Sequence, residues 1–144
     1  MSENDSGRRP ESVAGIDLGT TNSLIAVMDG ARPRVLPAPE GRAVMPSVVA
    51  VTAAGEIVVG EQARRYLLDA PERTAYSVKR LMGKGPADIG EERRLFPFRI
   101  EEQGDTIIRL RLGERVLTPP ELSACILRQL VLNAEAHLGA RLRQ

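Results

Sequence analysis

The stretch GIDLGTTNS, residues 15–23, joins a short apolar run, a carboxylate and a cluster of small hydroxyl residues. Residues 13–16 (VAGI) are apolar and lead into Asp17, and residues 23–28 (SLIAVM) form a second apolar run. This pattern predicts a strand, a tight turn and a second strand. The turn itself is expected at residues 19–22 (GTTN).

The residues of this turn suit a phosphate group. Glycine permits close backbone approach, so successive N–H groups can point into one concavity, and the hydroxyls of Thr20 and Thr21 add further donors. Asp17 would repel phosphate directly, but it can hold Mg²⁺ through water, because this ion keeps several of its waters. The turn therefore predicts a binding site for a metal nucleotide.

An ordinary hairpin explains the same residues equally well, because Asp and Gly are favoured in turns for geometric reasons alone. Two other phosphate-binding patterns are excluded. The stretch is not GxGxxG, since it has only two glycines and a strand follows it. Residues 83–85 (GKG) are not a Walker loop, which requires GxxxxGK followed by Ser or Thr.

The composition limits the classes of protein to which the chain can belong. Its 144 residues, 42% of them apolar, supply one core, which should bury about two thirds of the unfolded surface. The formal net charge of +1 gives no bias towards nucleic acid or a membrane surface. Cys125 is the only cysteine, which excludes an internal disulfide, and it is expected to be a small core residue. No apolar run is long enough to span a membrane, so we expect a cytoplasmic protein.

Hydrophobic patterning predicts a disordered arm over residues 1–11, which lack apolar side chains, and one domain over residues 12–144. A helix is expected over residues 61–69, ended by Pro71, whereas residues 76–81 are too short to classify. Besides the two strands above, strands are expected at residues 34–36, 47–51, 56–59, 98–102, 106–112 and 115–117. The last three should form an antiparallel meander with turns at Gly104 and Gly113.

The last element is the most strongly predicted helix. Residues 118–121 (TPPE) match a capping box with proline at the first helical position. Apolar residues then recur three and four positions apart, and Gly139 is a natural stop. The expected inward face consists of Leu122, Ile126, Leu127, Leu130, Ala134 and Leu138.

Five segments together resemble the seventy-kilodalton heat-shock chaperones, the heat shock protein 70 (DnaK-type) family. They occur in family order and cover almost everything after the N-terminal arm, which makes the resemblance highly specific. Residues 77–89 (SVKRLMGKGPADI) resemble especially the HscA-like branch, which serves iron–sulfur assembly. The five segments are GIDLGTTNS (15–23), GRAVMPSVV (41–49), VGEQAR (59–64), SVKRLMG (77–83) and PELSACIL (120–127).

The resemblance implies an α/β fold, an actin-like ATPase (ribonuclease H-like) lobe with a mixed sheet and flanking helices. In that family two related lobes close over ATP or ADP with Mg²⁺. The resemblance makes Asp17 the residue that holds Mg²⁺ through water, and it makes Lys79 and Thr20 catalytic. Lys79 would position the attacking water and meet the γ-phosphate. The implied nucleotide-binding residues are Gly19, Thr20, Thr21, Asn22 and Arg80.

These roles agree with the chemistry of phosphoryl transfer, which depends chiefly on positioning and on neutralising charge. Taken alone, Lys79 would be interpreted as a surface lysine, because exposed lysines are commonplace. Only the motif around it favours a catalytic role.

The resemblance also implies a partial domain. The strand of VITVPAYF type that follows in the family would begin where this sequence stops, so we expect a truncated first lobe with weak ATP binding, an exposed sheet edge and marginal stability. The expected partners are the remainder of a DnaK-type chaperone or a second lobe, a J-domain co-chaperone and a nucleotide exchange factor. The expected function is the ATP-binding part of an ATP-dependent protein-folding chaperone of the stress response.

Two alternatives remain open from the sequence. The first is a carbohydrate kinase of the same actin-like superfamily, whose first phosphate loop can also contain Asp-x-Gly-Thr-Thr. Lys79 in its KRLMG context and the PSVV segment at residues 46–49 argue against it. The second is a non-catalytic interaction module that keeps the fold but uses its surface to bind chaperones or co-chaperones.

Overall fold

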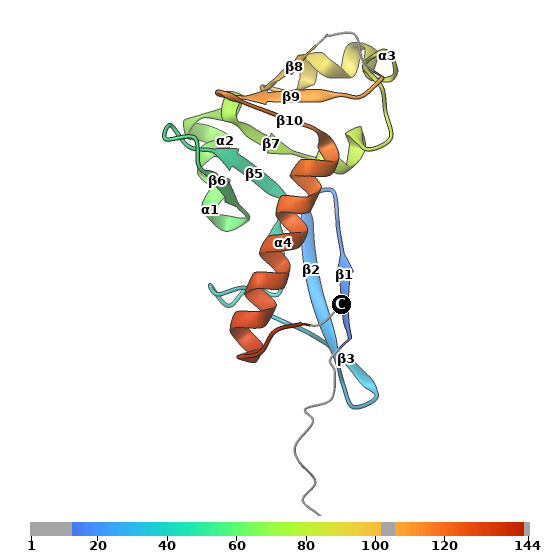
Figure 1. Cartoon of the computed structure of the whole chain (residues 1–144), viewed down its shortest axis with the longest axis vertical. Coiled ribbons are helices and arrows are strands. Elements are labelled where there is room, and N and C mark those ends of the chain that lie inside the picture. The colour runs from blue at the N-terminus through green and yellow to red at the C-terminus, as the bar shows by residue number, and fades with distance from the viewer. Residues whose placement is uncertain (1–12, 102–105, 143–144) are drawn as a thin grey trace, which may run out of the picture.

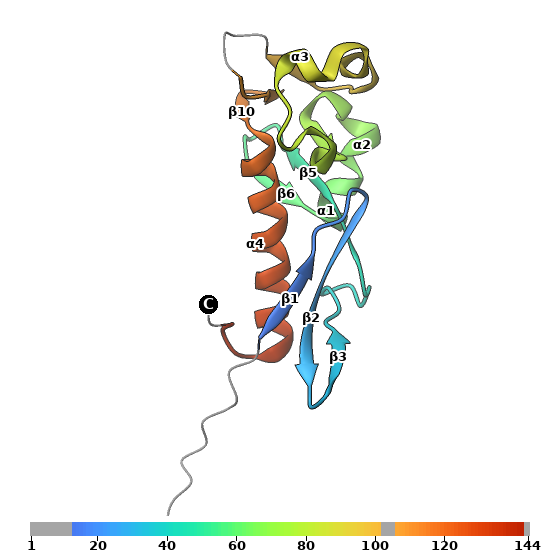
Figure 2. The same cartoon turned by 90° about the vertical axis from the view of Figure 1, so that its right-hand side faces the viewer.

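The computed structural model describes residues 13–101 and 106–142 and has an elongated α/β architecture (Figure 1). The longest helix, α4 (Pro119–Leu138), runs along the molecule and contacts β2, β5 and β6. The view at right angles shows the β1–β3 sheet beside the C-terminal half of this helix (Figure 2). The predicted arm, residues 1–11, lies outside the described residues.

The first sheet contains the stretch with which the sequence analysis began. Strand β1 (Ala14–Asp17) pairs antiparallel with β2 (Asn22–Asp29), with Asp17 opposite Leu24. Strand β3 (Arg32–Val35) pairs with the other edge of β2, and β4 (Met45–Pro46) pairs with its first residues. The predicted strand, turn and strand are confirmed. The third strand begins two residues earlier than predicted and ends before the buried Leu36.

The second sheet has β5 (Val48–Val51) between β6 (Ile57–Val59) and β7 (Thr74–Tyr76). All four residues of β5 are buried, as their β-branched run predicts, and the β5–β6 hairpin is confirmed. The predicted helix over residues 61–69 is present as two single turns, α1 (Glu61–Arg64) and α2 (Tyr66–Asp69). They join at Arg65, whose backbone stays right-handed helical with φ −60° and ψ −33°. A 3₁₀ turn, η1 (Pro71–Arg73), follows.

The segment that the sequence left unclassified contains the end of β7 and a 3₁₀ turn, η2 (Val78–Leu81). A one-turn helix, α3 (Pro86–Ile89), and a further 3₁₀ segment, η3 (Gly90–Leu95), come next and were not predicted. Each of these elements has six residues or fewer. Such lengths are too short for a hydrophobic period to be recognised.

The third sheet is the predicted meander, with β9 (Arg109–Leu112) between β8 (Arg99–Glu101) and β10 (Arg115–Leu117). Ile108, Leu110 and Leu112 are fully buried, whereas Arg109 is exposed, so the predicted alternation is confirmed. The turn expected at Gly104 lies outside the described residues.

Helix α4 agrees closely with its prediction. Thr118 caps it in a capping box with Glu121, and Gly139 ends it in the left-handed conformation, with φ 63°. Leu122, Ile126, Leu130 and Ala134 are buried. Cys125 is only partly buried, because it lies at the margin of the apolar face rather than on it.

One cluster of buried apolar side chains from all three sheets and α4 forms the main core. The α/β class is confirmed, whereas the family resemblance implied a mixed sheet. Every strand pairing among the described residues is instead antiparallel, and the strands form three sheets. Where consecutive strands pair, the short connection between them permits antiparallel pairing only, since parallel pairing needs a long crossover.

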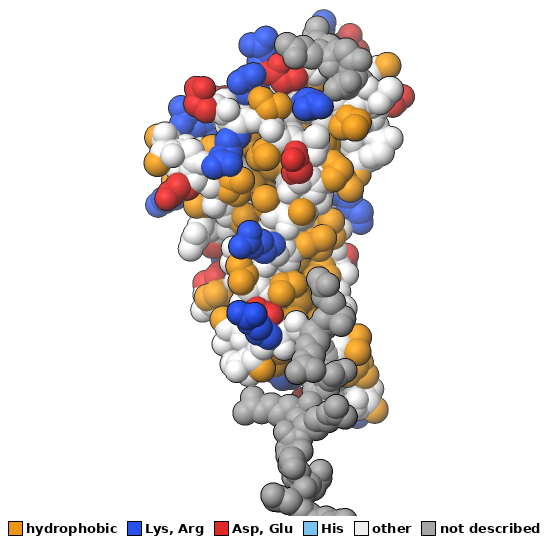
Figure 3. All heavy atoms as spheres, viewed as in Figure 1, with side chains coloured by type: hydrophobic (Ala, Val, Ile, Leu, Met, Phe, Trp, Pro, Cys, Tyr) orange, Lys and Arg blue, Asp and Glu red, His pale blue; other side chains and the backbone are white. Residues whose placement is uncertain are grey.

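Two apolar surfaces stay open in this arrangement. Strand β1 lies at the edge of its sheet, and Ile16 on it is 38% exposed. On α4, Leu132 is 47% exposed. Figure 3 shows hydrophobic side chains gathered along the middle of the face on which α4 lies. None of the helices in the described part of the chain is long and apolar enough to cross a membrane.

Candidate functional site

The turn between β1 and β2 has a geometry that only glycine permits at one position. A Cβ atom added to Gly19 would lie 2.0 Å from the backbone oxygen of Asn22. No atom lies within 4 Å of the corresponding position at Gly15. Gly19 is therefore required by the close approach of two backbone segments, whereas Gly15 is not.

Two buried serines hold this turn from behind. The hydroxyl oxygen of Ser23, on β2, lies 2.8 Å from that of Ser47, which follows β4. The amide of Gly19 donates to the Ser23 hydroxyl over 3.2 Å, and the Ser47 hydroxyl donates to the carbonyl of Gly19 over 2.9 Å. The amide of Ser47 also donates to the carbonyl of Thr21 over 2.8 Å. Both ends of the turn are thus fixed to the segment that follows β4.

Three other side chains of the turn have no such role. Within the described residues, the side chains of Thr20, Thr21 and Asn22 form no hydrogen bond with protein. Thr20 and Thr21 line an open hollow of about 380 Å³, a volume within the range of small-molecule sites. Its other lining residues are Ser47, Val48, Leu67, Tyr76, Ser77 and Pro97. Free hydroxyl donors thus face a space that a ligand can enter.

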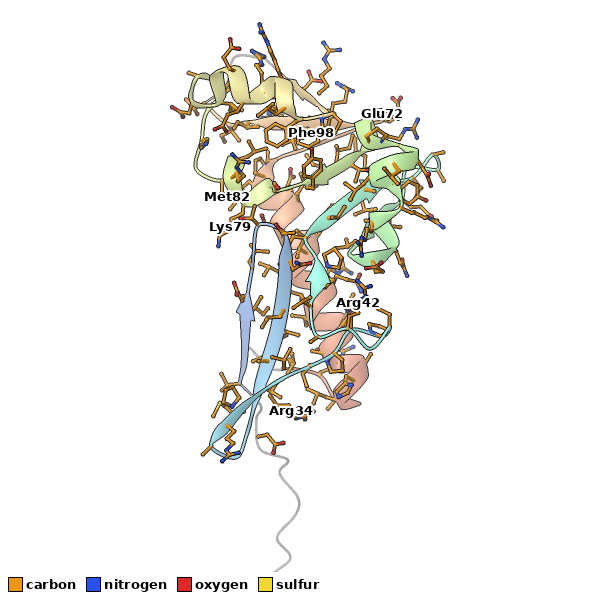
Figure 4. The ribbon with its side chains drawn as sticks, turned by 180° about the vertical axis from the view of Figure 1, so that it is seen from behind. Arg34, Arg42, Glu72, Lys79, Met82 and Phe98 are labelled. Atoms are coloured by element: carbon orange, nitrogen blue, oxygen red, sulfur yellow. The ribbon has the colours of Figure 1, made fainter. Side chains whose placement is uncertain are left out.

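Lys79 lies on η2, close to this turn. Figures 1 and 2 both place η2 beside the connection between β1 and β2, and Figure 4 shows Lys79 at the level of that connection. Ser77, the residue directly before η2, has a positive φ of 54°, the only such value at a non-glycine residue among those described. The Lys79 side chain is exposed, and its ammonium has no carboxylate partner in the described part of the chain. An unpaired cation beside free hydroxyl donors suits an anionic ligand.

Arg80 faces a different neighbour. Its guanidinium lies 3.9 Å from the carboxylate of Glu92, which Lys84 also approaches, to 3.6 Å. Arg80 and Glu92 line a smaller hollow of about 100 Å³, and Tyr76 and Ser77 border both hollows. The structure therefore brings Thr20 and Thr21 to one hollow and Arg80 to the adjacent one.

Asp17 ends β1 with its side chain exposed. Among residues 13–101 and 106–142, no three His, Cys, Asp or Glu side chains are grouped so that they could enclose a metal ion. A lone carboxylate does not make a zinc or calcium cage, but it fits Mg²⁺, which takes one or two carboxylates together with water and phosphate oxygens. The residues present are thus compatible with a magnesium nucleotide.

Three residues that line the larger hollow were not predicted as site residues: Ser47, Tyr76 and Ser77. For Ser47 a signal was present, because a serine stands directly before the apolar run of residues 48–51. A polar residue at the start of a buried strand must find a hydrogen-bond partner. Tyr76 carries no comparable signal. Ser77 carries none either, because the left-handed backbone of a serine cannot be recognised from its neighbours.

In a comparison with known protein families, the model of the family described as "Hsp70 protein" matches residues 13–144. The match covers all five segments on which the resemblance was based. It includes the turn between β1 and β2, the serine that supports it and the 3₁₀ turn that carries Lys79.

Proposed function

The chain belongs to the Hsp70 family, and from this premise we propose that residues 19–22 bind the phosphates of ATP or ADP. Family membership implies a chaperone nucleotide-binding region of the actin-like ATPase fold, and the α/β architecture with several sheets is consistent with it. The observation that carries the proposal is that the backbone of the turn is hydrogen-bonded within the protein, whereas its threonine side chains are not. Its backbone is fixed from behind by Ser23 and Ser47, while the hydroxyls of Thr20 and Thr21 stay free to bind a ligand.

The roles of the individual residues are those that the family implies, and of these residues Thr20 and Thr21 line the larger hollow. Thr20, Thr21 and Asn22 would donate hydrogen bonds to phosphate oxygens, and Asp17 would hold Mg²⁺ through water. Bound Mg²⁺ would supply charge neutralisation at the phosphates. Lys79, unpaired and exposed beside the turn, would position the attacking water and contact the γ-phosphate. Arg80, in the adjacent hollow, would line the nucleotide side.

We place this region as the first, ribonuclease H-like lobe of a chaperone whose second lobe supplies the opposite wall of the nucleotide cleft. A nucleotide gains affinity from burial on both sides, so this chain alone should bind ATP weakly. The proposed partners are that second lobe, a J-domain co-chaperone and a nucleotide exchange factor. The family match supports this function over the carbohydrate kinase. The HscA-like branch, the cytoplasmic location and the stress-response role stay predictions.

A calorimetric titration with Mg-ATP tests the proposal, carried out on this chain alone and again with the second lobe of an Hsp70 chaperone supplied separately. Weak or unmeasurable binding by the chain alone, and binding with turnover once the lobe is added, are expected. Strong binding and turnover by the chain alone would contradict the one-wall interpretation. No binding in either case would favour the interaction module, and turnover that requires a sugar would favour the kinase.

The catalytic assignment has its own variant. Lys79→Ala should lower turnover of the assembled lobes by about 100-fold, because it removes a charge that acts on the transferred phosphoryl group. Lys84→Ala is the matched control, since Lys84 is a nearby lysine that pairs with Glu92 instead. Equal turnover in the two variants would remove Lys79 from the mechanism.

A further inference from the structure

Ser23 and Ser47 together with Gly19 form a closed ring of hydrogen bonds behind the turn. The Gly19 amide donates to Ser23, and the Ser47 hydroxyl donates to the Gly19 carbonyl. A hydroxyl has a single proton, so Ser47, having given its own to Gly19, can only accept from Ser23. The 2.8 Å contact between the two hydroxyl oxygens therefore runs from Ser23 to Ser47. The ring satisfies both backbone polar groups of Gly19.

The two serines of this ring are buried, whereas Gly19 is half-buried. Ser23 is 1% exposed and Ser47 is 3% exposed. A buried polar group without a hydrogen bond is destabilising, and hydrogen bonds in a connected network strengthen one another. Loss of either hydroxyl therefore removes two of the three bonds, and the third loses the support of the network.

The ring also determines where the phosphate-facing residues lie. Gly19 directly precedes Thr20, and the Ser47 amide holds the carbonyl of Thr21, so one residue fixes the backbone on both sides of the Thr20–Thr21 peptide. A steric limit acts at the same point, where a Cβ on Gly19 would meet the Asn22 oxygen. The backbone of the turn is thus fixed without help from any ligand.

We propose that Ser23 and Ser47 are positioning residues for phosphate, which hold the turn in its binding geometry before the nucleotide arrives. The proposal rests on the proposed function, since the ligand is the same nucleotide. The positioning role extends that proposed function by assigning a role to the PSVV segment at residues 46–49. Neither serine is expected to touch the reacting atoms. Their effect is preorganisation, which reduces the free energy lost on ordering the site when ligand binds.

The proposal is tested with Ser23→Ala, Ser47→Ala and the double variant, each made in the full chain and assayed with the supplied second lobe. Each single variant should weaken Mg-ATP binding by about tenfold, the equivalent of one net hydrogen bond. Binding of adenosine, which lacks phosphate, should stay unchanged. The double variant should weaken binding by less than the sum of the two single losses, because the Ser23–Ser47 bond is lost in both single variants. Additive losses would contradict the ring.

A second readout does not depend on nucleotide. Amide hydrogen exchange at Gly19, measured by NMR in the free chain, should accelerate by about tenfold or more in Ser23→Ala. This variant lacks the hydroxyl that accepts the hydrogen bond of the Gly19 amide. Unchanged exchange at Gly19 would overturn the proposal whatever ATP does. Faster exchange with unchanged ATP affinity would overturn the positioning role. If the wild-type chain with the second lobe binds no Mg-ATP, the proposed function fails and the positioning role fails with it.

Two further variants separate positioning from general stability. Ser123→Ala is the matched control, because Ser123 is also buried but lies on α4, with its hydroxyl near the sulfur of Met82. It should change neither Gly19 exchange nor ATP affinity. Ser47→Thr keeps the hydroxyl that donates to the Gly19 carbonyl. It should restore ATP affinity to within about threefold of wild type. If Ser47→Thr is as impaired as Ser47→Ala, the hydroxyl is not the acting group.

Discussion

The N-terminus of α4 and the turn between β1 and β2 each place a small hydroxyl residue against backbone polar groups, but over very different sequence distances. At α4, Thr118 and Glu121 satisfy one another within four residues. In the turn, Gly19 depends on Ser47, which lies 28 positions further along the chain. The first arrangement is local and the second requires the sheets to assemble.

The largest effect should come from the buried face of α4. Leu122 is 0% exposed, so Leu122→Ala should lower the free energy of unfolding by about 3 kcal/mol, through lost burial and the cavity left behind. Urea denaturation measures the change. Leu132→Ala, at a position that is 47% exposed on the same helix, should cost less than about 0.5 kcal/mol. Equal losses would show that the helix does not pack as described.

The second-largest loss of stability should come from a substitution of Gly19 in the turn. Gly19→Ala should lower the free energy of unfolding by about 2 kcal/mol, because its methyl group would overlap the Asn22 oxygen. It should also abolish any Mg-ATP binding that the assembled lobes show. Gly15→Ala, where the added atom meets open space, should stay within about 0.5 kcal/mol of wild type in the same denaturation experiment. Tolerance of alanine at residue 19 would mean that the turn adopts another conformation.

The helix cap should have a smaller effect. Thr118→Ala removes the side chain that accepts from the Glu121 amide and should cost about 1 kcal/mol. Thr118→Ser keeps the hydroxyl and should be nearly neutral. Thermal unfolding followed by circular dichroism compares the two variants. Because the cap is local, neither variant should alter exchange at the Gly19 amide, and a change there would break the distinction between the two regions.

The smallest effect should be a pH dependence at the same cap. Hydrogen bonds to Glu121, first from the Thr118 amide and then from its hydroxyl, hold the pKa of the Glu121 carboxyl below its ordinary value of 4.5. A lowered folded pKa means that this stabilisation is complete above 4.5 and is lost as the pH falls through the folded pKa. Since the carboxylate is exposed, the loss should be under about 1 kcal/mol. Glu121→Gln, which cannot titrate, should show a smaller loss of stability between pH 6 and about pH 3.

Much of the fold could be predicted because its signals are local. The alternation of Ile108, Leu110 and Leu112 with arginines specified a half-buried strand. The capping box and apolar spacing specified α4 almost to the residue. Residues 78–95 could not be predicted in this way, because their 3₁₀ and single-turn segments are too short to show a period. The mixed sheet that was predicted is replaced by three antiparallel sheets in the described residues.

The candidate site divides in the same manner. The sequence predicted the turn, its glycine and its threonine hydroxyls, because phosphate-binding turns need these residue types close together. It did not identify the ring behind the turn, since nothing near Gly19 in the sequence points to Ser47. The sequence also did not predict that Thr20, Thr21 and Ser77 line the same hollow.

The sequence by itself determined the strand, turn and strand of residues 14–29, the amphipathic helix α4 and the family to which the motifs belong. Each depends on interactions between residues a few positions apart, or on sequence motifs that can be compared directly with those of a family. The tertiary structure alone decided which serine closes the ring on Gly19 and that η2 brings Lys79 beside the turn. The physical reason is that hydrogen bonds and steric limits between distant segments come into being only when packing brings those segments together.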